Sequence, residues 1–245
     1  MKSSYTEVEF KELVSRNKKR SGWNFSSMRT ISYPKWDYLE IVKDYLKVTD
    51  KVLDIGTGGG ERFTELSKHF RKGVGIDIDL EMIKENSAKY SAIPNLQFVI
   101  LDESLKGLDN DFNVILNRHA PFNLKSIKNH LVPGGLFITQ QVGEKNMLNV
   151  MKILNTPISL PPIDEVMISS NNMKTIRIEK YDIKYVVRDV ESLIFWLAAL
   201  DKNHSAIDGP SVLKNVDIFN ELLQDNVTEE GFVTNEERYL AIATS

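Results

Sequence analysis

Short apolar runs alternate with helix-forming segments through the middle of this chain. The runs lie at residues 51–56, 73–78, 96–102, 112–117 and 136–142. Strands that are buried on both faces read as continuous apolar runs, and a helix between two such strands lets them pair in parallel. The pattern therefore predicts an α/β fold with a mostly parallel sheet and helices on both faces.

Beyond residue 143 the pattern is less regular. Residues 174–187 read as extended, residues 189–200 as a helix wide enough in its apolar face to lie buried against the sheet, and residues 238–244 as a closing strand. A helical insertion is expected at about 201–226. We predict a main domain over 37–245 and an N-terminal helical cap over 1–36.

Composition limits the classes of function. The 245 residues carry a formal net charge of -3 and 42% hydrophobic residues, which supplies a core but no general attraction to nucleic acid or to an anionic membrane. The chain has no cysteine, which excludes disulfides and thiolate metal sites and fits a reducing cytoplasm. No apolar run approaches membrane-spanning length, no signal-peptide pattern opens the chain, and no His and carboxylate spacing suggests a metal.

The segment VLDIGTGGGE, residues 52–61, places four glycines directly behind the first apolar run. Read as the dinucleotide pattern G-x-G-x-x-G from Gly56, it puts Glu61 at the third position, where a carboxylate would face the pyrophosphate at the helix N-terminus. A P-loop is excluded because no Lys-Ser/Thr pair follows. Phosphate binding, and with it an NAD-dependent dehydrogenase, is therefore disfavoured.

Read as D-x-G-x-G-x-G, the same segment matches at Asp54, Gly56, Gly58 and Gly60. It resembles the first motif of class I S-adenosylmethionine (SAM)-dependent methyltransferases, and the chain is similar to small uncharacterised bacterial members. The resemblance implies a Rossmann-like seven-stranded sheet whose last strand is antiparallel. SAM carries an ammonium, a sulfonium and a carboxylate but no phosphate, which suits an acidic side chain beside the turn.

Further segments extend the resemblance over residues 36–143. It implies that Asp77, at the end of the second strand, accepts from the ribose hydroxyls and that Ile78 covers the adenine ring. After the third strand, Asp102 is the expected acceptor for the adenine amino group, with Glu103 as the alternative. The segment LVPGGLFITQQV resembles the turn and fifth strand of the family. Thr57 in the turn and Asn117 at the end of the fourth strand complete the expected cofactor contacts.

The end of the fourth strand reads LNRHAPFN. Amino methyltransferases of the adenine and glutamine type usually carry N/D-P-P-Y/F/W there, whereas this chain has Asn117, Arg118, His119 and Ala120, which puts that scheme in doubt. We hypothesise that His119 is a general base or a donor that orients the substrate. The alternative is a histidine packed at the strand end. Arg118 pairs either with a substrate anion or with a nearby acid.

The N-terminal arm is basic and aromatic. No acidic residue lies between Glu12 and Asp37, while six cations are interleaved with aromatic rings. Trp23 and Trp36 are the predicted substrate contacts of a cap over the cofactor. A footprint for single-stranded RNA and a solvated arm packed on the core are the alternatives.

These observations predict a SAM-dependent methyltransferase that acts on a small molecule. An rRNA or tRNA base methyltransferase and a catalytically silent SAM-binding protein are the alternatives. The sequence indicates neither the methyl acceptor nor the oligomeric state.

Overall fold

The computed structural model describes residues 1–17, 27–153, 163–203 and 212–245. The chain forms two compact units. The first comprises Met1–Pro34, Gly143–Leu160 and Tyr181–Glu237, and the second Lys35–Val142, Pro161–Lys180 and Arg238–Ser245. The domain boundaries expected from the sequence stay a prediction. In the part of the chain that the structure describes, no helix combines the length and apolar character needed to cross a bilayer.

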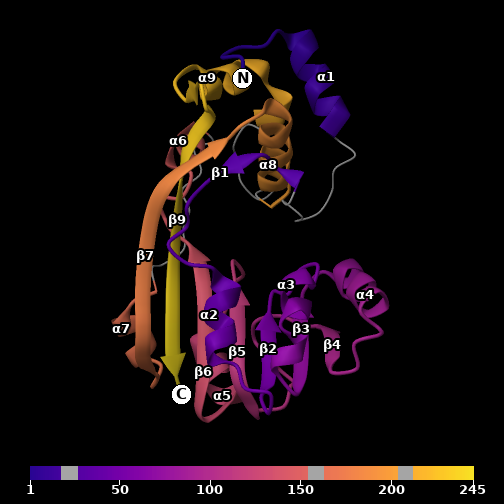
Figure 1. Cartoon of the computed structure of the whole chain (residues 1–245), viewed down its shortest axis with the longest axis vertical. Helices are drawn as coiled ribbons and strands as arrows, with labels where there is room; N and C mark the ends of the chain where they lie inside the picture. The colour runs from indigo at the N-terminus through magenta and orange to yellow at the C-terminus, as the bar shows by residue number, and fades with distance from the viewer. Residues whose placement is uncertain (18–26, 154–162, 204–211) are drawn as a thin grey trace. The chain divides into compact units, whose positions relative to one another are not determined.

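A parallel sheet forms the centre of the second unit (Figure 1). Its strands are β2 (Lys51–Ile55), β3 (Lys72–Asp77), β4 (Leu96–Ile100), β5 (Phe112–Arg118) and β6 (Leu131–Val142), which lie in the order β4-β3-β2-β5-β6. All four pairs are parallel. Helices α3 (Glu61–Glu65), α4 (Leu80–Lys89) and α5 (Leu124–His130) lie between the strands in sequence. The mostly parallel α/β fold is thereby confirmed.

Two long strands complete the sheet. β9 (Gly231–Thr244) pairs with β6 in the antiparallel sense, and β7 (Lys174–Val187) lies beside β9. In the first unit, β1 (Thr30–Ile31) pairs with β7 and β8 (Val227–Thr228) pairs with β9. The sheet therefore has nine described strands, of which two are only two residues long. The other seven match the expected seven-stranded sheet with its last strand antiparallel.

The core of the second unit lies along the middle of this sheet. Leu53 and Ile115, on the neighbouring strands β2 and β5, are fully buried. Asp37 caps helix α2 (Tyr38–Tyr45), because its side chain accepts from two backbone N–H groups of the first turn, and Asp79 caps α4 in the same way. The shorter elements of this unit are a 3₁₀ turn at Ser67–His69 and α7 (Glu165–Ser169).

The strand order places a switch point between β2 and β5. β3 and β4 follow β2 on one side, while β5 and β6 lie on the other, so successive connections leave the sheet centre in opposite directions. In open α/β sheets such a point leaves a crevice beyond the carboxyl ends of the strands. Ile55 and Asn117 are register partners at this edge, so the segments that follow them flank the crevice.

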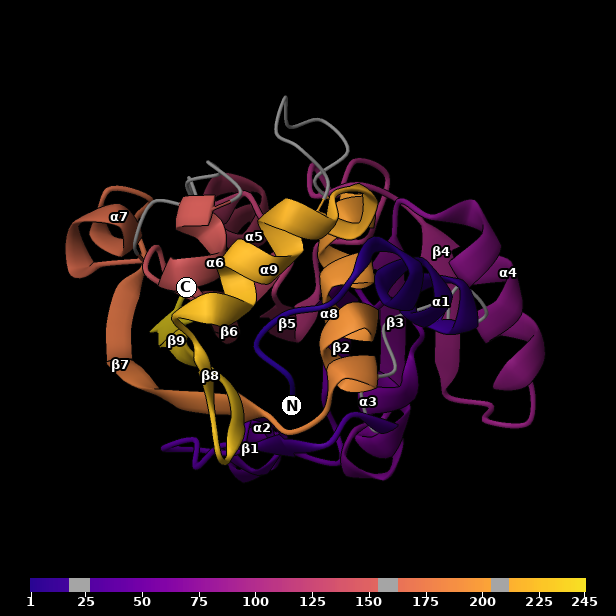
Figure 2. The same ribbon diagram turned by 90° about the horizontal axis from the view of Figure 1, so that it is seen from above.

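The first unit has a helical core. It contains α1 (Glu7–Asn17), α6 (Leu148–Ile153), α8 (Val190–Asn203), α9 (Val216–Gln224) and a 3₁₀ turn at Val212–Lys214. Figures 1 and 2 show α1, α8 and α9 together. Leu193 and Leu197 of α8 pack in one cluster with Phe10 of α1 and Phe219 of α9. Val187 of β7 and Phe232 of β9 belong to the same cluster, so the apolar face of α8 packs against helices as well as against strands, which the sequence suggested.

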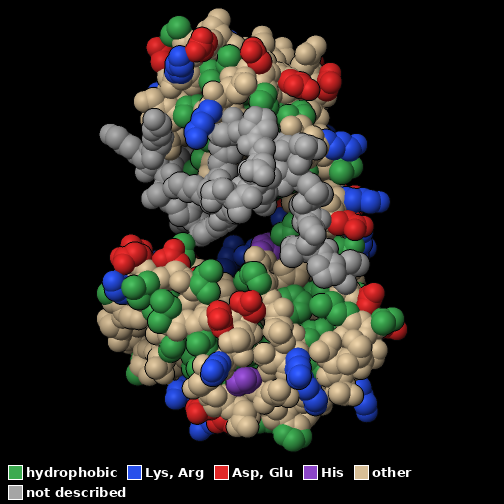
Figure 3. Space-filling model, turned by 180° about the vertical axis from the view of Figure 1, so that it is seen from behind, with side chains coloured by type: hydrophobic (Ala, Val, Ile, Leu, Met, Phe, Trp, Pro, Cys, Tyr) green, Lys and Arg blue, Asp and Glu red, His purple; other side chains and the backbone are tan. Residues whose placement is uncertain are grey.

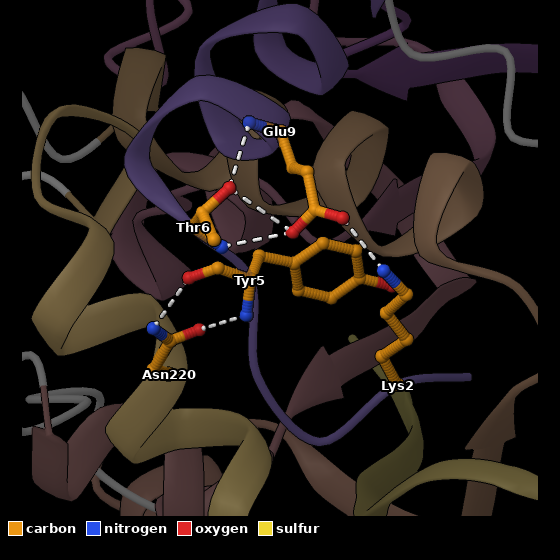
Figure 4. A network of polar contacts seen from close by, with 5 residues as sticks. All are labelled: Lys2, Tyr5, Thr6, Glu9 and Asn220. Carbon is orange, nitrogen blue, oxygen red and sulfur yellow. Dashed lines mark hydrogen bonds and ion pairs between the residues drawn. The ribbon is translucent and has the colours of Figure 1, made fainter.

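The start of α1 is held by a small polar network (Figure 4). Thr6 and Glu9 form a capping box, in which each backbone N–H donates to the other side chain. The Asn220 side chain of α9 accepts from the Tyr5 N–H at 2.8 Å and donates to the Tyr5 carbonyl at 2.9 Å. One amide side chain therefore satisfies both backbone groups of Tyr5 and attaches α1 to α9.

Replacing Asn220 with alanine removes both bonds and leaves two backbone groups of Tyr5 without these partners. We expect Asn220→Ala to lower the free energy of unfolding by about 1–3 kcal/mol in urea denaturation. The matched control is Lys2→Ala, which removes an exposed ion pair with Glu9 at 2.6 Å and should leave the free energy of unfolding nearly unchanged, because solvent screens such a pair. Equal losses in the two variants would contradict this account.

Candidate functional site

The glycine turn follows β2 at the switch point. Gly56, Gly58 and Gly60 have φ values of +74°, +54° and +73°, which L side chains rarely adopt. The N–H groups of Gly56 and Thr57 both donate to the Ile76 carbonyl of β3 at 2.9 Å. The turn is therefore fixed to the neighbouring strand in a conformation that glycine alone adopts easily.

The two sides of this turn differ. A Cβ added at Gly56 would lie 2.2 Å from the Cβ of Ala120, so the turn packs directly against the segment that follows β5. A Cβ added at Gly58 would meet no atom within 4 Å. The turn thus has one side closed by protein and one side open, which fits a group bound against its backbone.

Asp77 at the end of β3 shapes the turn. Its carboxylate accepts from the Gly58 N–H at 2.9 Å and from the Asp79 N–H at 3.0 Å, which still leaves a lone pair on each oxygen. The Asn86 side chain of α4 donates to the Gly58 carbonyl at 2.6 Å, and the Tyr90 hydroxyl donates to the Gly59 carbonyl at 3.2 Å. Asn86 and Tyr90 were not predicted from the sequence, although an asparagine within a predicted helix is a usable signal, and Asn86 is indeed buried.

A small cavity of about 70 Å³ opens beside the turn. Asp54, half-buried, lines it together with Arg62 and Arg118. Desolvation raises the pKa of Asp54 to about 7, and the nearby Asp77 adds to the rise, while Thr57 and Arg118 oppose it. The Asp54 carboxylate is therefore poorly stabilised by its own protein, and a cation beside it would favour its charged form.

The two arginines of the cavity are available to an anion. The Arg118 side chain makes no hydrogen bond or ion pair within the described ranges, and desolvation followed by repulsion from Arg62 lowers its pKa. Among the residues that the structure describes, the charged partner of Arg62 is Glu65, at a long distance of 3.9 Å. The cavity thus combines one acidic group with two weakly engaged cations.

Apolar side chains are exposed at the carboxyl ends of β3 and β4. Ile78 is 74% exposed and Ile100 is 48% exposed, and Ile100 is the register partner of Asp77. Asp102 is exposed and accepts from the Ser104 hydroxyl at 2.5 Å and from the Ser104 N–H at 3.0 Å, and these two bonds lower its pKa. Glu103 is exposed beside it. Asp77, Ile78 and Ile100 therefore lie at one edge, while the choice between Asp102 and Glu103 stays a prediction.

Asn117 lies inside the sheet rather than at its surface. Its side chain is fully buried, donates to the Ile55 carbonyl at 3.3 Å and accepts from the Thr139 hydroxyl at 3.0 Å and from Gln141. These bonds connect the ends of β2, β5 and β6. The polar atoms of Asn117 are occupied within the protein, so the residue positions the strand ends, and its predicted contact with a cofactor is untested.

His119 follows β5 directly and adopts an unusual backbone conformation. Its φ is +57°, a strained value for a residue other than glycine that is common at functional sites. The residue as a whole is exposed, but its ring contact with Gln140 is part-buried, with Nε2 3.0 Å from the side-chain Nε2 of Gln140, so the imidazole is partly removed from water. Desolvation by the surrounding protein and the charges of Arg118 and Arg238 lower the pKa of His119 well below its usual range.

The two predicted tryptophan contacts have different outcomes. Trp36 is only 9% exposed, and its indole N–H donates to Gln140 Oε1 at 2.8 Å, so the ring is packed into the protein rather than presented to a substrate. Trp23 lies outside the described residues, as do Lys18, Lys19, Arg20 and Phe25 of the basic arm. Lys35, another cation of the basic arm, lies in the second unit, where it donates to the Lys180 carbonyl at 3.5 Å.

The visible surface has mixed charge. Figure 3 shows acidic and basic side chains interspersed on the face that it presents, without a large field of one sign. Within the described residues, no group of three or more His, Cys, Asp or Glu side chains has the arrangement of a metal site.

Residues 52–135 match the family model described as a methyltransferase domain. This range contains the glycine turn, Asp77, Asp102 and the segment around His119. No curated protein matches the chain.

Solved structures share the fold at low sequence identity. The YcgJ protein from Bacillus subtilis has a TM-score of 0.61 and 18% identity, with 85% of this chain and 97% of that chain covered. A putative methyltransferase from Bacillus halodurans C-125 has a TM-score of 0.59 and 15% identity, with 84% and 96% covered. A putative sarcosine dimethylglycine methyltransferase from Galdieria sulphuraria has a TM-score of 0.52 and 16% identity, with 84% and 82% covered. The predicted fold is confirmed.

Gly58→Ala tests whether the open side of the turn receives a ligand. The new Cβ has space but a strained φ, so we expect a stability loss of about 1–2 kcal/mol together with at least tenfold weaker SAM binding in calorimetric titration. Gly134→Ala is the matched control, because its φ is +74° and its added Cβ also meets no atom within 4 Å. It should lose similar stability and keep its SAM affinity. Equal SAM affinity in the two variants would rule out a ligand at Gly58.

Proposed function

We propose that this chain is a SAM-dependent methyltransferase that transfers the methyl group to a small molecule; the match of residues 52–135 to a methyltransferase domain supports this. The observation that carries the proposal is the cavity beside the glycine turn, where Asp54 faces Arg62 and Arg118. SAM ends in an amino-acid group with one positive and one negative charge. This charge pattern is the complement of the cavity.

The charge of each cavity side chain indicates which group of SAM it would bind. Asp54 would hold the ammonium of the amino-acid group. This cation would stabilise the ionised carboxylate of Asp54, which desolvation disfavours in the unliganded protein. Arg118 and Arg62 would hold the carboxylate, since a guanidinium suits a carboxylate and neither has a strong partner among the described residues. The open backbone at Gly58 would lie against the ligand between these groups.

The nucleoside would occupy the edge formed by β3 and β4. The free lone pairs of Asp77 suit the ribose hydroxyls, and the exposed Ile78 and Ile100 suit the adenine faces. Asp102 or Glu103 would accept from the adenine amino group. Glu61 is paired with Lys89 at 2.8 Å and borders the turn, where its negative charge disfavours a phosphate.

When bound, SAM supplies an electrophilic methyl group on its sulfonium. The protein's part is to bind, orient and desolvate the two reactants. His119 directly precedes Ala120, which packs against Gly56, so the backbone of His119 lies close to the glycine turn. Arg118, the residue before His119, lines the cavity beside the turn and can orient an anionic group.

A small-molecule acceptor is favoured over RNA. The face shown in Figure 3 has no broad basic field, and the net charge of -3 gives no overall attraction to a polyanion. A silent SAM-binding protein is less well supported, because the strained backbone at His119 is typical of functional sites. The absence of cysteine fits a reducing cytoplasm.

The decisive experiment combines binding with transfer. Titration with SAM and with its demethylated product should show binding of both, and methyl-labelled SAM with a cell extract should label the small-molecule fraction. Failure to bind either ligand overturns the proposal. Binding without any transfer supports the silent protein, and label in the RNA fraction supports the RNA methyltransferase.

The pH dependence of SAM binding tests the role of Asp54. The raised pKa means that the unliganded protein keeps this carboxyl protonated below about pH 7, whereas an ammonium beside it favours ionisation. Binding below that pH should release a proton, and the affinity should rise by up to about tenfold per pH unit until about pH 7. Titration calorimetry in buffers of different ionisation enthalpy measures both effects.

Asp54→Asn is the control for this pH dependence. The variant should bind SAM more weakly and with an affinity that does not vary over the same range. Because a raised pKa stabilises the folded protein at low pH and this contribution is lost as the pH rises through about 7, the unliganded variant should gain stability over the wild type at alkaline pH. A pH dependence that persists in the variant would exclude Asp54 as its source.

A further inference from the structure

Gln140 connects two of the residues that the sequence singled out. It lies in β6, is 5% exposed, and has its side chain between Trp36 and His119. The Trp36 indole nitrogen only donates, so the Gln140 atom that faces it at 2.8 Å must be the amide oxygen. The orientation of the amide is therefore fixed by chemistry, and its NH₂ group points at His119.

This orientation determines the protonation of His119. The Gln140 NH₂ group only donates, so His119 Nε2 at 3.0 Å must accept and has no proton. A neutral imidazole has one N–H, which is then on Nδ1. The positive charges of Arg118 and Arg238 also favour the neutral imidazole, because both repel an imidazolium. The backbone N–H of His119 also donates to the backbone carbonyl of Gln140 at 3.0 Å, which holds the two backbones together.

We propose that Trp36 and Gln140 are positioning residues that hold His119 as a neutral imidazole with its proton on Nδ1, so that His119 donates a hydrogen bond to the methyl acceptor instead of removing its proton. The proposal rests on the proposed function for the identity of the reaction. The tautomer itself does not, because it follows from contacts within the second unit.

A donor at this place selects the chemistry of the acceptor. The Nδ1–H donor suits an acceptor oxygen with negative charge, such as a carboxylate or a phenolate, because a hydrogen bond to a charged acceptor is stronger than one to a neutral acceptor. A lone pair of this oxygen forms the bond to the methyl carbon while the carbon–sulfur bond breaks and its electron pair returns to sulfur as a neutral thioether. An anionic oxygen releases no proton in this step, so no base is required.

The tautomer can be measured without any activity. Nitrogen-15 NMR of the histidine side chains in the full chain should show His119 protonated on Nδ1 and not on Nε2. His130 is an internal reference, because its Nδ1 lies 2.7 Å from the Ser126 carbonyl and the residue precedes β6, at the opposite end of the strand from Gln140. His119→Asn identifies the signal among the four histidines. A wild-type His119 with its proton on Nε2 overturns the proposal.

Gln140→Glu tests the cause. A carboxylate still accepts from Trp36 but also accepts from His119, so Nε2 should become protonated and the apparent pKa of His119 should rise by at least one unit, with His130 unchanged. Gln140→Leu removes the donor and should give a mixture of tautomers. A His119 tautomer that is unchanged in both folded variants would show that Gln140 does not set it.

The donor role is tested by methyl transfer. His119→Asn keeps an N–H donor and should retain at least a third of the label incorporation, while His119→Ala should lose at least tenfold, with SAM affinity unchanged within twofold in both. Equal loss in the two variants overturns the donor role. With carbon-13 methyl SAM, the product should carry an O-methyl group, and an N-methyl product overturns the assigned acceptor. Absence of all transfer by a chain that binds SAM refutes the proposed function and leaves the tautomer measurement intact.

Discussion

The contact between Gly56 and Ala120 determines the geometry of the candidate site. The two residues follow β2 and β5, the strands that flank the switch point, and no side chain larger than hydrogen fits at Gly56. Because the turn and the segment after β5 touch, Asp54 on one strand and Arg118 on the other line one cavity. The same contact brings His119 next to the turn. A larger residue at position 56 would separate the binding and the reacting parts.

The electrostatics of the site follow from this close approach. Asp54 has a raised pKa because the packing that forms the cavity also removes water from its carboxyl group. Arg118 is affected in the corresponding way, since desolvation lowers its pKa. Neither charge is fully satisfied by the other, so the proposed zwitterionic ligand would stabilise both side chains in their charged forms. Binding and stability are therefore coupled through the same two side chains.

The sequence predicted what depends on local pattern. The strands, the glycine turn and Asp77 were found because spacing along the chain determines them. Gln140 was missed because its partners are 104 and 21 residues away, although a buried glutamine in a strand expected to be apolar was a signal. Trp36 was predicted to contact the substrate because an aromatic residue in a basic segment gives the same sequence pattern whether its ring is exposed or packed. Only the fold distinguishes these cases.

The protonation of His119 illustrates why a histidine near a methyl donor need not be a base. A general base gains a positive charge as it removes a proton, and here that charge would form beside Arg118, Arg238 and a sulfonium. A neutral donor gains no charge, so the same surroundings do not oppose it. The Gln140 amide adds a geometric reason, because it already occupies the nitrogen that would accept the proton. The arrangement that makes His119 a poor base therefore makes it a well-oriented donor.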